Sequence, residues 1–329
     1  MSLAEAVPVP PAPDPGLRGD ESSIAGGGIG DRLYQWGIVF FALCIPVLLI
    51  LIALELAVGA WPALREFGFG FLTSSTWDPV ANEYGAAPAI YGTLLTSAIA
   101  LAIATPLALG VAIFLAEFSP TAIRQPLAFL VDLLAAIPSV VYGLWGLKVL
   151  VPLLQRHVMP FISGTLGLGA LPLFSGPAYG SSIFAAGIVL AIMVLPYISA
   201  VSREVLLAVP RSQREAALAL GATRWEMIWG AVLPYARSGI VGGIILGLGR
   251  ALGETMAVTM VIGNSHEISS SLFAPGTTLA SQIANEFAEA TGEQRAALMA
   301  VGFALFVITL VVNAIARWLV WRVSSERRV

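Results

Sequence analysis

Charged residues are scarce in this chain of 329 residues: they make up 11% of it, whereas hydrophobic residues make up 57%. About a quarter of the residues of a typical soluble domain are charged. The composition therefore excludes an ordinary soluble protein and indicates a membrane protein. There is a single cysteine, Cys44, so an internal disulfide is excluded as well.

Motifs for several kinds of catalysis are also absent. The only lysine, Lys148, lies in an apolar segment, so the sequence has no Walker A loop to hold nucleotide phosphates. His266 and Glu267 do not continue into H-E-x-x-H, and Asp132 has no intramembrane aspartate to pair with, which disfavours an intramembrane enzyme. Neither His157 nor His266 has the spacing of a metal ligand, and we expect both to be solvated residues of external loops.

Six apolar segments are long enough to cross a bilayer, which takes about 20 residues. They lie near 36–59, 89–115, 126–151, 182–204, 236–262 and 297–320. The sequence therefore predicts an all-α polytopic integral membrane protein with six transmembrane helices. The stretch 153–181 is interrupted by prolines and glycines and is interpreted as a re-entrant or surface loop. The aromatic residues of the stretch 60–88, Trp77 among them, are interpreted as an interfacial belt.

The chain divides into a transmembrane region, 32–322, and two tails, 1–31 and 323–329. The first tail is rich in Pro, Gly and Ala, lacks the basic start and apolar region of a signal peptide, and is expected to be disordered. Most of the 17 Lys and Arg residues, including Arg317 near the C-terminus, fall on the side of the membrane that holds the N-terminus. The positive-inside rule therefore places both termini in the cytoplasm.

A polar connector, 205–236, joins the fourth and fifth spans. Within it, Ser212 begins an S-x-x-E capping box and Thr223 begins a T-x-x-E capping box, and each box predicts the start of a helix. Gly221 stands where a left-handed C-cap would end the first of these helices. The connector is thus expected to fold as helix, glycine turn and helix on the cytoplasmic surface.

The first helix of the connector is rich in alanine. Its small side chains suit insertion into a protein groove better than burial in lipid, although Trp225 and Trp229 would also suit a connector lying on the lipid surface. We therefore interpret the connector as a docking surface for another protein.

The fifth span carries two charged residues, Arg250 and Glu254, near its middle. A charge at the centre of a bilayer costs roughly 2.5–3.5 kcal/mol, so both must face protein or water. Being four residues apart on the helix of this span, they share one face and can pair. Gly239, Gly243 and Gly247 fall on the same face, which predicts close packing against another helix. We interpret the pair as part of a substrate pathway, with a purely structural lock between helices as the alternative.

The connector resembles the EAA loop of bacterial ABC importer permeases. The resemblance rests on the letters EAA from Glu215, on Gly221, and on the dipeptide LP at 233–234. It implies the type I ABC importer permease fold, in which this loop forms the coupling helix that docks into a separate ATPase. By this resemblance, the ATPase-coupling residues are Glu215, Ala216, Ala217 and Gly221.

Four further motifs resemble the PstC family, the phosphate-specific permease subunits within this class. They are RALGETMAVTMVIGN from Arg250, WDP at 77–79, IYGTL from Ile90 and IPSVVYGLWG from Ile137. The resemblance covers roughly residues 35–322. It implies half of the translocation pathway of an ATP-driven phosphate importer in the bacterial inner membrane, working by alternating access.

The resemblance also implies partners. These are a second permease resembling PstA, two copies of an ATPase resembling PstB, and an external phosphate-binding protein resembling PstS. The chain itself is then a transport subunit rather than an enzyme, with no cofactor and no metal of its own, because the partner ATPase binds ATP and Mg. No nucleic-acid partner is expected.

Two alternatives follow from the same residues. A permease for sulfate or molybdate would share the fold and the EAA loop, whereas a channel would not need a coupling helix. Phosphate is favoured on chemical grounds, because Arg250 can donate a forked pair of hydrogen bonds to an oxyanion while Glu254 accepts the P–OH proton. Sulfate carries no such proton near neutral pH, so the carboxylate would repel it.

Overall fold

The computed structural model describes residues 29–325. Nearly all of the predicted N-terminal tail, and the end of the predicted C-terminal tail, lie outside these residues. The chain has two parts, one ending at Leu54 and one beginning at Glu55, which we describe separately. In the first part, the described residues all belong to helix α1 (Ile29–Phe67), which is apolar around its whole circumference.

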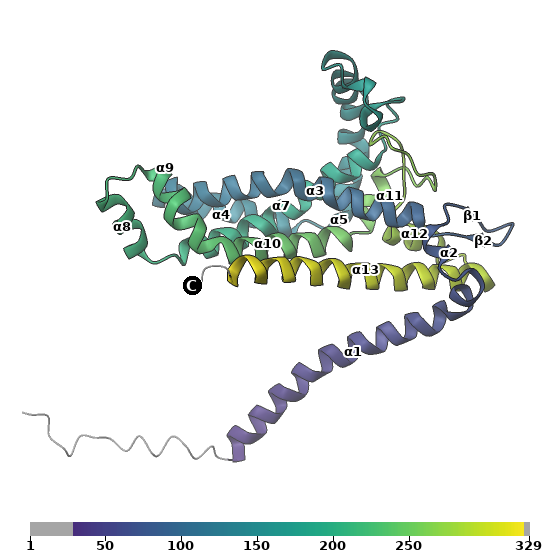
Figure 1. Cartoon of the computed structure of the whole chain (residues 1–329), viewed down its shortest axis with the longest axis horizontal. Coiled ribbons are helices and arrows are strands. Elements are labelled where there is room, and N and C mark those ends of the chain that lie inside the picture. The colour runs from purple at the N-terminus through teal and green to yellow at the C-terminus, as the bar shows by residue number, and fades with distance from the viewer. Residues whose placement is uncertain (1–28, 326–329) are drawn as a thin grey trace, which may run out of the picture. The chain divides into compact units, whose positions relative to one another are not determined.

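The second part is built from helices and one short hairpin (Figure 1). Its longest helices are α3 (Ala87–Ile113), α7 (Ile183–Leu207), α10 (Leu233–Leu252) and α13 (Gly292–Ser325). The shorter elements are α2 (Gly70–Thr73), β1 (Trp77–Asp78), β2 (Glu83–Tyr84), α4 (Thr121–Ala136), α5 (Ser139–Trp145), α6 (Val151–Leu153), α8 (Arg211–Ala219), α9 (Arg224–Met227), α11 (Met256–Val261) and α12 (Leu279–Glu286). Strands β1 and β2 pair antiparallel.

Five helical runs of the described residues are long and apolar enough to span a membrane. They are Gly30–Phe67, Ala87–Phe118, Ile183–Leu207, Arg224–Leu252 and Gly292–Arg322. A sixth candidate is the pair Ala122–Ala136 and Ser139–Thr165, which is bent by 89°. The predicted all-α membrane fold with up to six spans is therefore confirmed.

Two of the predicted spans are wrong as continuous helices. The third, 126–151, bends between α4 and α5, where Ile137 is extended and Pro138 directly precedes the next helix. Proline disfavours helical backbone at the residue before it and lacks an N–H for the helical ladder, so the bend falls there. The fifth, 236–262, begins earlier, at Arg224, and breaks after Leu252.

The stretch 153–181 is not an irregular surface loop throughout, because helical turns continue through it as far as Thr165, but a re-entrant segment remains compatible with its 89° bend from α4. Five-residue π-helical turns occur at Leu154–Val158 and Phe161–Thr165, and two short 3₁₀ turns follow at Leu168–Ala170 and Pro172–Phe174. Coloured teal in Figure 1, this region projects away from the long helices.

Helix α7 lies at the centre of the second part, with α3 packed along one side of it and α10 along another. On α3, four fully buried alanines recur every four residues: Ala100, Ala104, Ala108 and Ala112. On α10, a methyl group added to Gly239, Gly243 or Gly247 would press against Val205, Val201 or Ile198 of α7. Small residues at this spacing let helices approach closely in a membrane, where hydrophobic burial does not drive association.

Candidate functional site

Arg250 and Glu254 form an ion pair, with Arg250 Nη2 3.1 Å from Glu254 Oε2. The Glu254 side chain is 3% exposed, whereas that of Arg250 is 38% exposed. The pair therefore has one buried member and one member that reaches an open space. Removing one partner of a buried ion pair leaves an uncompensated charge, at a cost of about 3–5 kcal/mol.

The two residues do not share a continuous helix, which corrects the predicted geometry. Helix α10 ends at Leu252, and Glu254 lies in the break before α11. Glycine is a poor helix former, and Gly249 and Gly253 flank the end of α10. Glu254 Oε1 also accepts a hydrogen bond of 3.3 Å from the backbone N–H of Ala257, in the first turn of α11. The carboxylate thus joins the end of one helix to the start of the next.

The hydrogen-bonding capacity of Arg250 is only partly used. Its Nε is buried and has no hydrogen-bond partner within the described residues. The guanidinium lies 6.0 Å from the centre of the Tyr197 ring of α7, an arrangement that favours a cation. A buried donor without a partner costs free energy unless a ligand or water satisfies it.

A cavity of about 430 Å³ adjoins Arg250. It is lined from α7, α10 and α13 by Tyr197, Gly242, Ile245, Leu246, Gly249, Arg250, Asn313 and Arg317. No sequence pattern associates Asn313 or Arg317 with Arg250, because they lie more than 60 residues away along the chain and only the packing of α13 on α10 brings them together.

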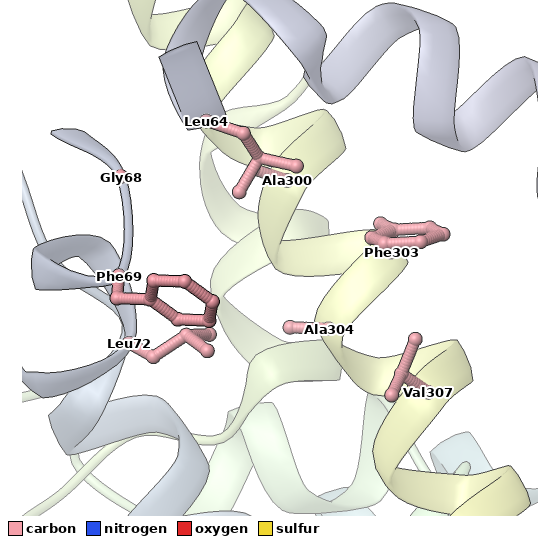
Figure 2. A pocket seen from close by; sticks show the side chains of 8 residues that line it. All are labelled: Leu64, Gly68, Phe69, Leu72, Ala300, Phe303, Ala304 and Val307. Atoms are coloured by element: carbon pink, nitrogen blue, oxygen red, sulfur yellow. The ribbon is translucent and has the colours of Figure 1, made fainter. Parts of the chain in front are cut away.

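A second hollow, of about 340 Å³, has the opposite chemistry (Figure 2). It lies between the segment from Leu64 to Leu72 and one face of α13. Its lining is apolar: Leu64, Gly68, Phe69, Leu72, Ala300, Phe303, Ala304 and Val307. With no polar side chain to orient an ion, this hollow suits hydrocarbon, so the polar cavity beside Arg250 is the candidate site.

The connector presents part of its first helix to solvent. Glu215, Ala216 and Gly221 are exposed, while Ala217 is half-buried against the apolar cluster at the ends of α3, α7 and α10 nearest the connector. Leu220 at the end of α8 is 90% exposed, although it is a large apolar residue.

One of the two predicted capping boxes is confirmed. Thr223 Oγ1 accepts a hydrogen bond from the backbone N–H of Glu226, and Glu226 accepts one in return from the N–H of Thr223. Gly221 has φ of +85°, the predicted left-handed conformation. The N–H groups of Gly221 and Ala222 donate to the carbonyls of Leu218 and Ala217, which closes the end of α8.

The prediction of a capping box at Ser212 is wrong. Helix α8 begins at Arg211, directly after Pro210, so Ser212 is already inside the helix and makes no cap. Proline has no N–H to leave unsatisfied and its φ suits the start of a helix, so it replaces the capping side chain here.

Arg214 is the residue of the connector that the sequence-based reasoning missed. Its guanidinium donates to both carboxylate oxygens of Glu117, in the π-helical turn Phe114–Phe118 that directly follows α3, with the shortest bond at 2.8 Å. It also donates to the backbone carbonyls of Leu206 and Val209, at the end of α7. Arg214 therefore connects α8 to the C-terminal ends of two long helical runs, Ala87–Phe118 and α7.

A polar cluster in the second part of the chain corrects the interpretation of His266. Trp77 belongs to this cluster: its Nε1–H donates to Glu286 at 2.8 Å and its ring stacks on His266. His266 in turn lies 3.5 Å from Glu286 and is only one-third exposed, so it is not a freely solvated loop residue. Gln294 donates to the same carboxylate. Glu286 thus joins the β1 hairpin, the loop before α12, and α13.

Comparison with known proteins agrees with this architecture. The family model described as "binding-protein-dependent transport system inner membrane component" matches residues 108–325. The chain is 50% identical over 300 residues to the phosphate transport system permease protein PstC of Pasteurella multocida, which covers 90% of this chain and 93% of the relative. It is 41% identical over 263 residues to a probable PstC of Methanocaldococcus jannaschii, covering 78% of this chain and 82% of the relative.

Solved structures share the fold at low sequence identity. A bacterial ABC transporter involved in the import of the acidic polysaccharide alginate matches with a TM-score of 0.52 and 16% identity, covering 88% of this chain and 99% of that one. An inward-facing MetNI methionine ABC transporter matches with a TM-score of 0.51 and 18% identity, covering 71% and 94%. The fold is therefore that of ABC importer permeases.

Proposed function

The chain belongs to the family of binding-protein-dependent transport system inner membrane components, and we propose that within it this chain is the permease subunit of an ATP-driven importer of inorganic phosphate. The observation that carries the proposal is 50% identity to a PstC permease over nine-tenths of both chains. The relatives compared are named for phosphate in bacteria and in an archaeon, which favours phosphate over the alternative of sulfate or molybdate.

The surface of the connector supports a role in coupling to an ATPase. The sequence has no Walker A loop, so ATP and Mg would be bound by a partner subunit. Glu215, Ala216 and Gly221 lie on the exposed part of the connector, where a groove of the ATPase could receive them, with Ala217 on its inner side. The complete transporter would contain a second permease resembling PstA, two ATPase copies resembling PstB, and an external binding protein resembling PstS.

The position of the connector suggests how movement reaches the pathway. A force on α8 would pass through Arg214 to Glu117, in the helical turn that continues α3, and to the end of α7, because one guanidinium bonds to both. The chain continues from the connector directly into α10, which ends beside Arg250 and Glu254. Alternating access would then be a movement of α3, α7 and α10 driven by the ATPase. In this arrangement both termini lie in the cytoplasm and the protein spans the bacterial inner membrane.

The ion pair supplies the chemistry for selecting phosphate. Arg250 has an unused buried N–H with which to bind an oxyanion, and its partner Glu254 is an acceptor for the P–OH proton. A sulfate ion offers no proton near neutral pH, so its oxygens would face the Glu254 carboxylate without a hydrogen bond. Selection would therefore depend on repulsion of sulfate as much as on attraction of phosphate.

Transport measurements on the reconstituted complex test this function. The wild-type complex is expected to import radiolabelled phosphate on ATP hydrolysis and to reject sulfate. Glu254→Gln keeps the shape of the side chain but removes its charge, so the preference for phosphate over sulfate should fall by at least about tenfold. Arg250→Gln should abolish import.

Three results would contradict the proposal at different levels. A wild-type complex that imports sulfate or molybdate but not phosphate would make the substrate wrong. An unchanged rate and unchanged rejection of sulfate in Glu254→Gln would remove the carboxylate from selection. Full import by Arg250→Gln would show that the ion pair only locks the helices together.

A further inference from the structure

Two arginines from different helices line the cavity beside the ion pair. Arg250 comes from the end of α10 and Arg317 from the last third of α13. Arg250 is balanced by Glu254, but Arg317 makes no ion pair within the described residues. The cavity therefore carries about one uncompensated positive charge, which an anion would neutralise.

Asn313 adds a neutral polar group on the same side. It precedes Arg317 by four residues, so the two side chains lie on one face of α13. Its Nδ2 donates to the carbonyl of Thr309 at 2.8 Å, which leaves its carboxamide oxygen as an acceptor on the cavity. Arg317 can supply forked N–H donors and Asn313 an acceptor, which are the groups that a protonated phosphate requires.

The order of these groups along the helices gives the cavity a direction. Helix α10 runs away from the connector towards Arg250, and α13 runs towards the C-terminus on the connector side. The lining of the cavity begins at Gly242 on α10, eight residues before Arg250, which is about 12 Å along a helix. In the orientation proposed above, the cavity extends from Arg250 towards the cytoplasm, and Arg317 lies farther along it than Asn313.

We infer that Arg317 and Asn313 form a second anion station, which takes inorganic phosphate from Arg250 on its way to the cytoplasm. The inference rests on the proposed function, because it assigns further residues to the same pathway. The cavity volume of about 430 Å³ falls in the range of small-molecule sites, roughly 300–1,000 Å³. Passing an anion between two weak stations avoids a single tight site from which release would be slow.

The station can be tested from the cytoplasmic side. The complex is reconstituted with its partner subunits in vesicles of neutral phosphatidylcholine, and import of radiolabelled phosphate is measured with increasing unlabelled phosphate inside. In the wild type, internal phosphate should occupy the station and inhibit import. In Arg317→Gln, the internal concentration that halves the rate should rise about tenfold, because one charge-assisted contact is lost. Arg317→Lys, which keeps the charge but not the fork, should fall between them.

Arg322→Gln is the matched control. It removes the same charge from the same helix end, but Arg322 does not line the cavity and stacks on Trp318 instead. It should behave as the wild type. Asn313→Leu keeps the charges of Arg250 and Arg317 and should weaken inhibition by internal phosphate a few-fold. It therefore tests the station if the Arg317→Gln complex does not assemble.

The outcomes separate this inference from the function on which it rests. A wild-type complex that imports no phosphate contradicts the function itself. Import by the wild type with no inhibition by internal phosphate, or Arg317→Gln and Asn313→Leu matching Arg322→Gln, overturns the station alone. An effect of Arg317→Gln that appears only when phosphatidylglycerol is added would mean that Arg317 holds a lipid headgroup, which also overturns it.

Discussion

Two arginines of this protein, Arg214 and Arg250, each pair with a buried glutamate, yet they use their donors differently. Arg214 donates to both oxygens of Glu117 and to two backbone carbonyls. Arg250 has a single ion-pair contact with Glu254, its Nε is buried without a partner in the described residues, and its other side borders a cavity. The first arginine is satisfied by protein alone, whereas the second has donors to spare.

The difference matches the work that each region is proposed to do. A connector that transmits force must not bend, and hydrogen bonds from one guanidinium to two helices make it rigid. A site that binds and releases an anion needs donors that protein does not already occupy. The same residue type therefore holds helices together in the connector, as Arg214, and provides a group for binding the anion in the membrane, as Arg250.

The largest effect is expected from breaking the connector joint with Arg214→Gln. This change leaves the Glu117 carboxylate buried without its partner and two carbonyls without a donor, which should cost about 3–5 kcal/mol of stability. ATP-driven import should be lost, and thermal unfolding of the purified complex should occur at a markedly lower temperature. Arg250→Gln should also abolish import, but it should leave the connector and its docking to the ATPase intact.

Two variants check this explanation. Arg211→Gln removes a charge from the exposed start of the same helix and should have little effect, since exposed charges contribute little to stability. Replacing both partners, with Arg214→Met and Glu117→Leu together, should recover part of the lost stability. If the double variant is as unstable as Arg214→Gln, the buried charge on Glu117 is not the cause.

More of the connector than of the membrane site could be predicted from the sequence, because its structure depends mainly on local patterns. Capping boxes and glycine turns are local, so Thr223, Glu226 and Gly221 are placed correctly by their spacing alone. The Ser212 box fails because the helix begins at Arg211, directly after Pro210 and two residues earlier than a cap at Ser212 would allow. The pairing of Arg214 with Glu117 spans 97 residues and depends on how α3 packs against α7, which no local pattern contains.

The membrane site shows the same limit. Arg250 and Glu254 are found because charges in an apolar span are conspicuous, and their pairing follows from their spacing. The break at Gly253 and the bend at Pro138 are missed because apolar residues continue through both, so hydropathy alone cannot separate a straight span from a broken one. Arg317 looks like an ordinary positive-inside arginine until α13 is packed against α10.

A smaller effect should follow from Gly221→Ala, which tests whether the connector needs its sharp turn. Nothing lies within 4 Å of a methyl group added there, so the cost is backbone strain at φ of +85° and not a collision. An alanine in the left-handed conformation costs about 1–2 kcal/mol. Import should fall several-fold, measured as phosphate moved per ATP hydrolysed. Gly230→Ala is the control, because Gly230 is helical with equally open space and should tolerate alanine.

The smallest effect concerns the contact between His266 and Glu286, which becomes an ion pair only when the histidine is protonated and therefore, unlike the two arginine pairs, depends on pH. Burial lowers the pKa of His266 below its ordinary value of 6.5, while the Glu286 carboxylate partly opposes that shift. The unfolded chain therefore binds a proton more readily than the folded one, so this residue makes stability fall as the pH drops below about 6.5.

His266→Phe keeps the stack on Trp77 but cannot titrate. Between pH 7.5 and 5.5, its melting temperature should fall less than that of the wild type, by roughly a degree or two. Identical slopes would assign the acid sensitivity to other groups, and a steeper slope in the variant would mean that the attraction to Glu286 outweighs burial.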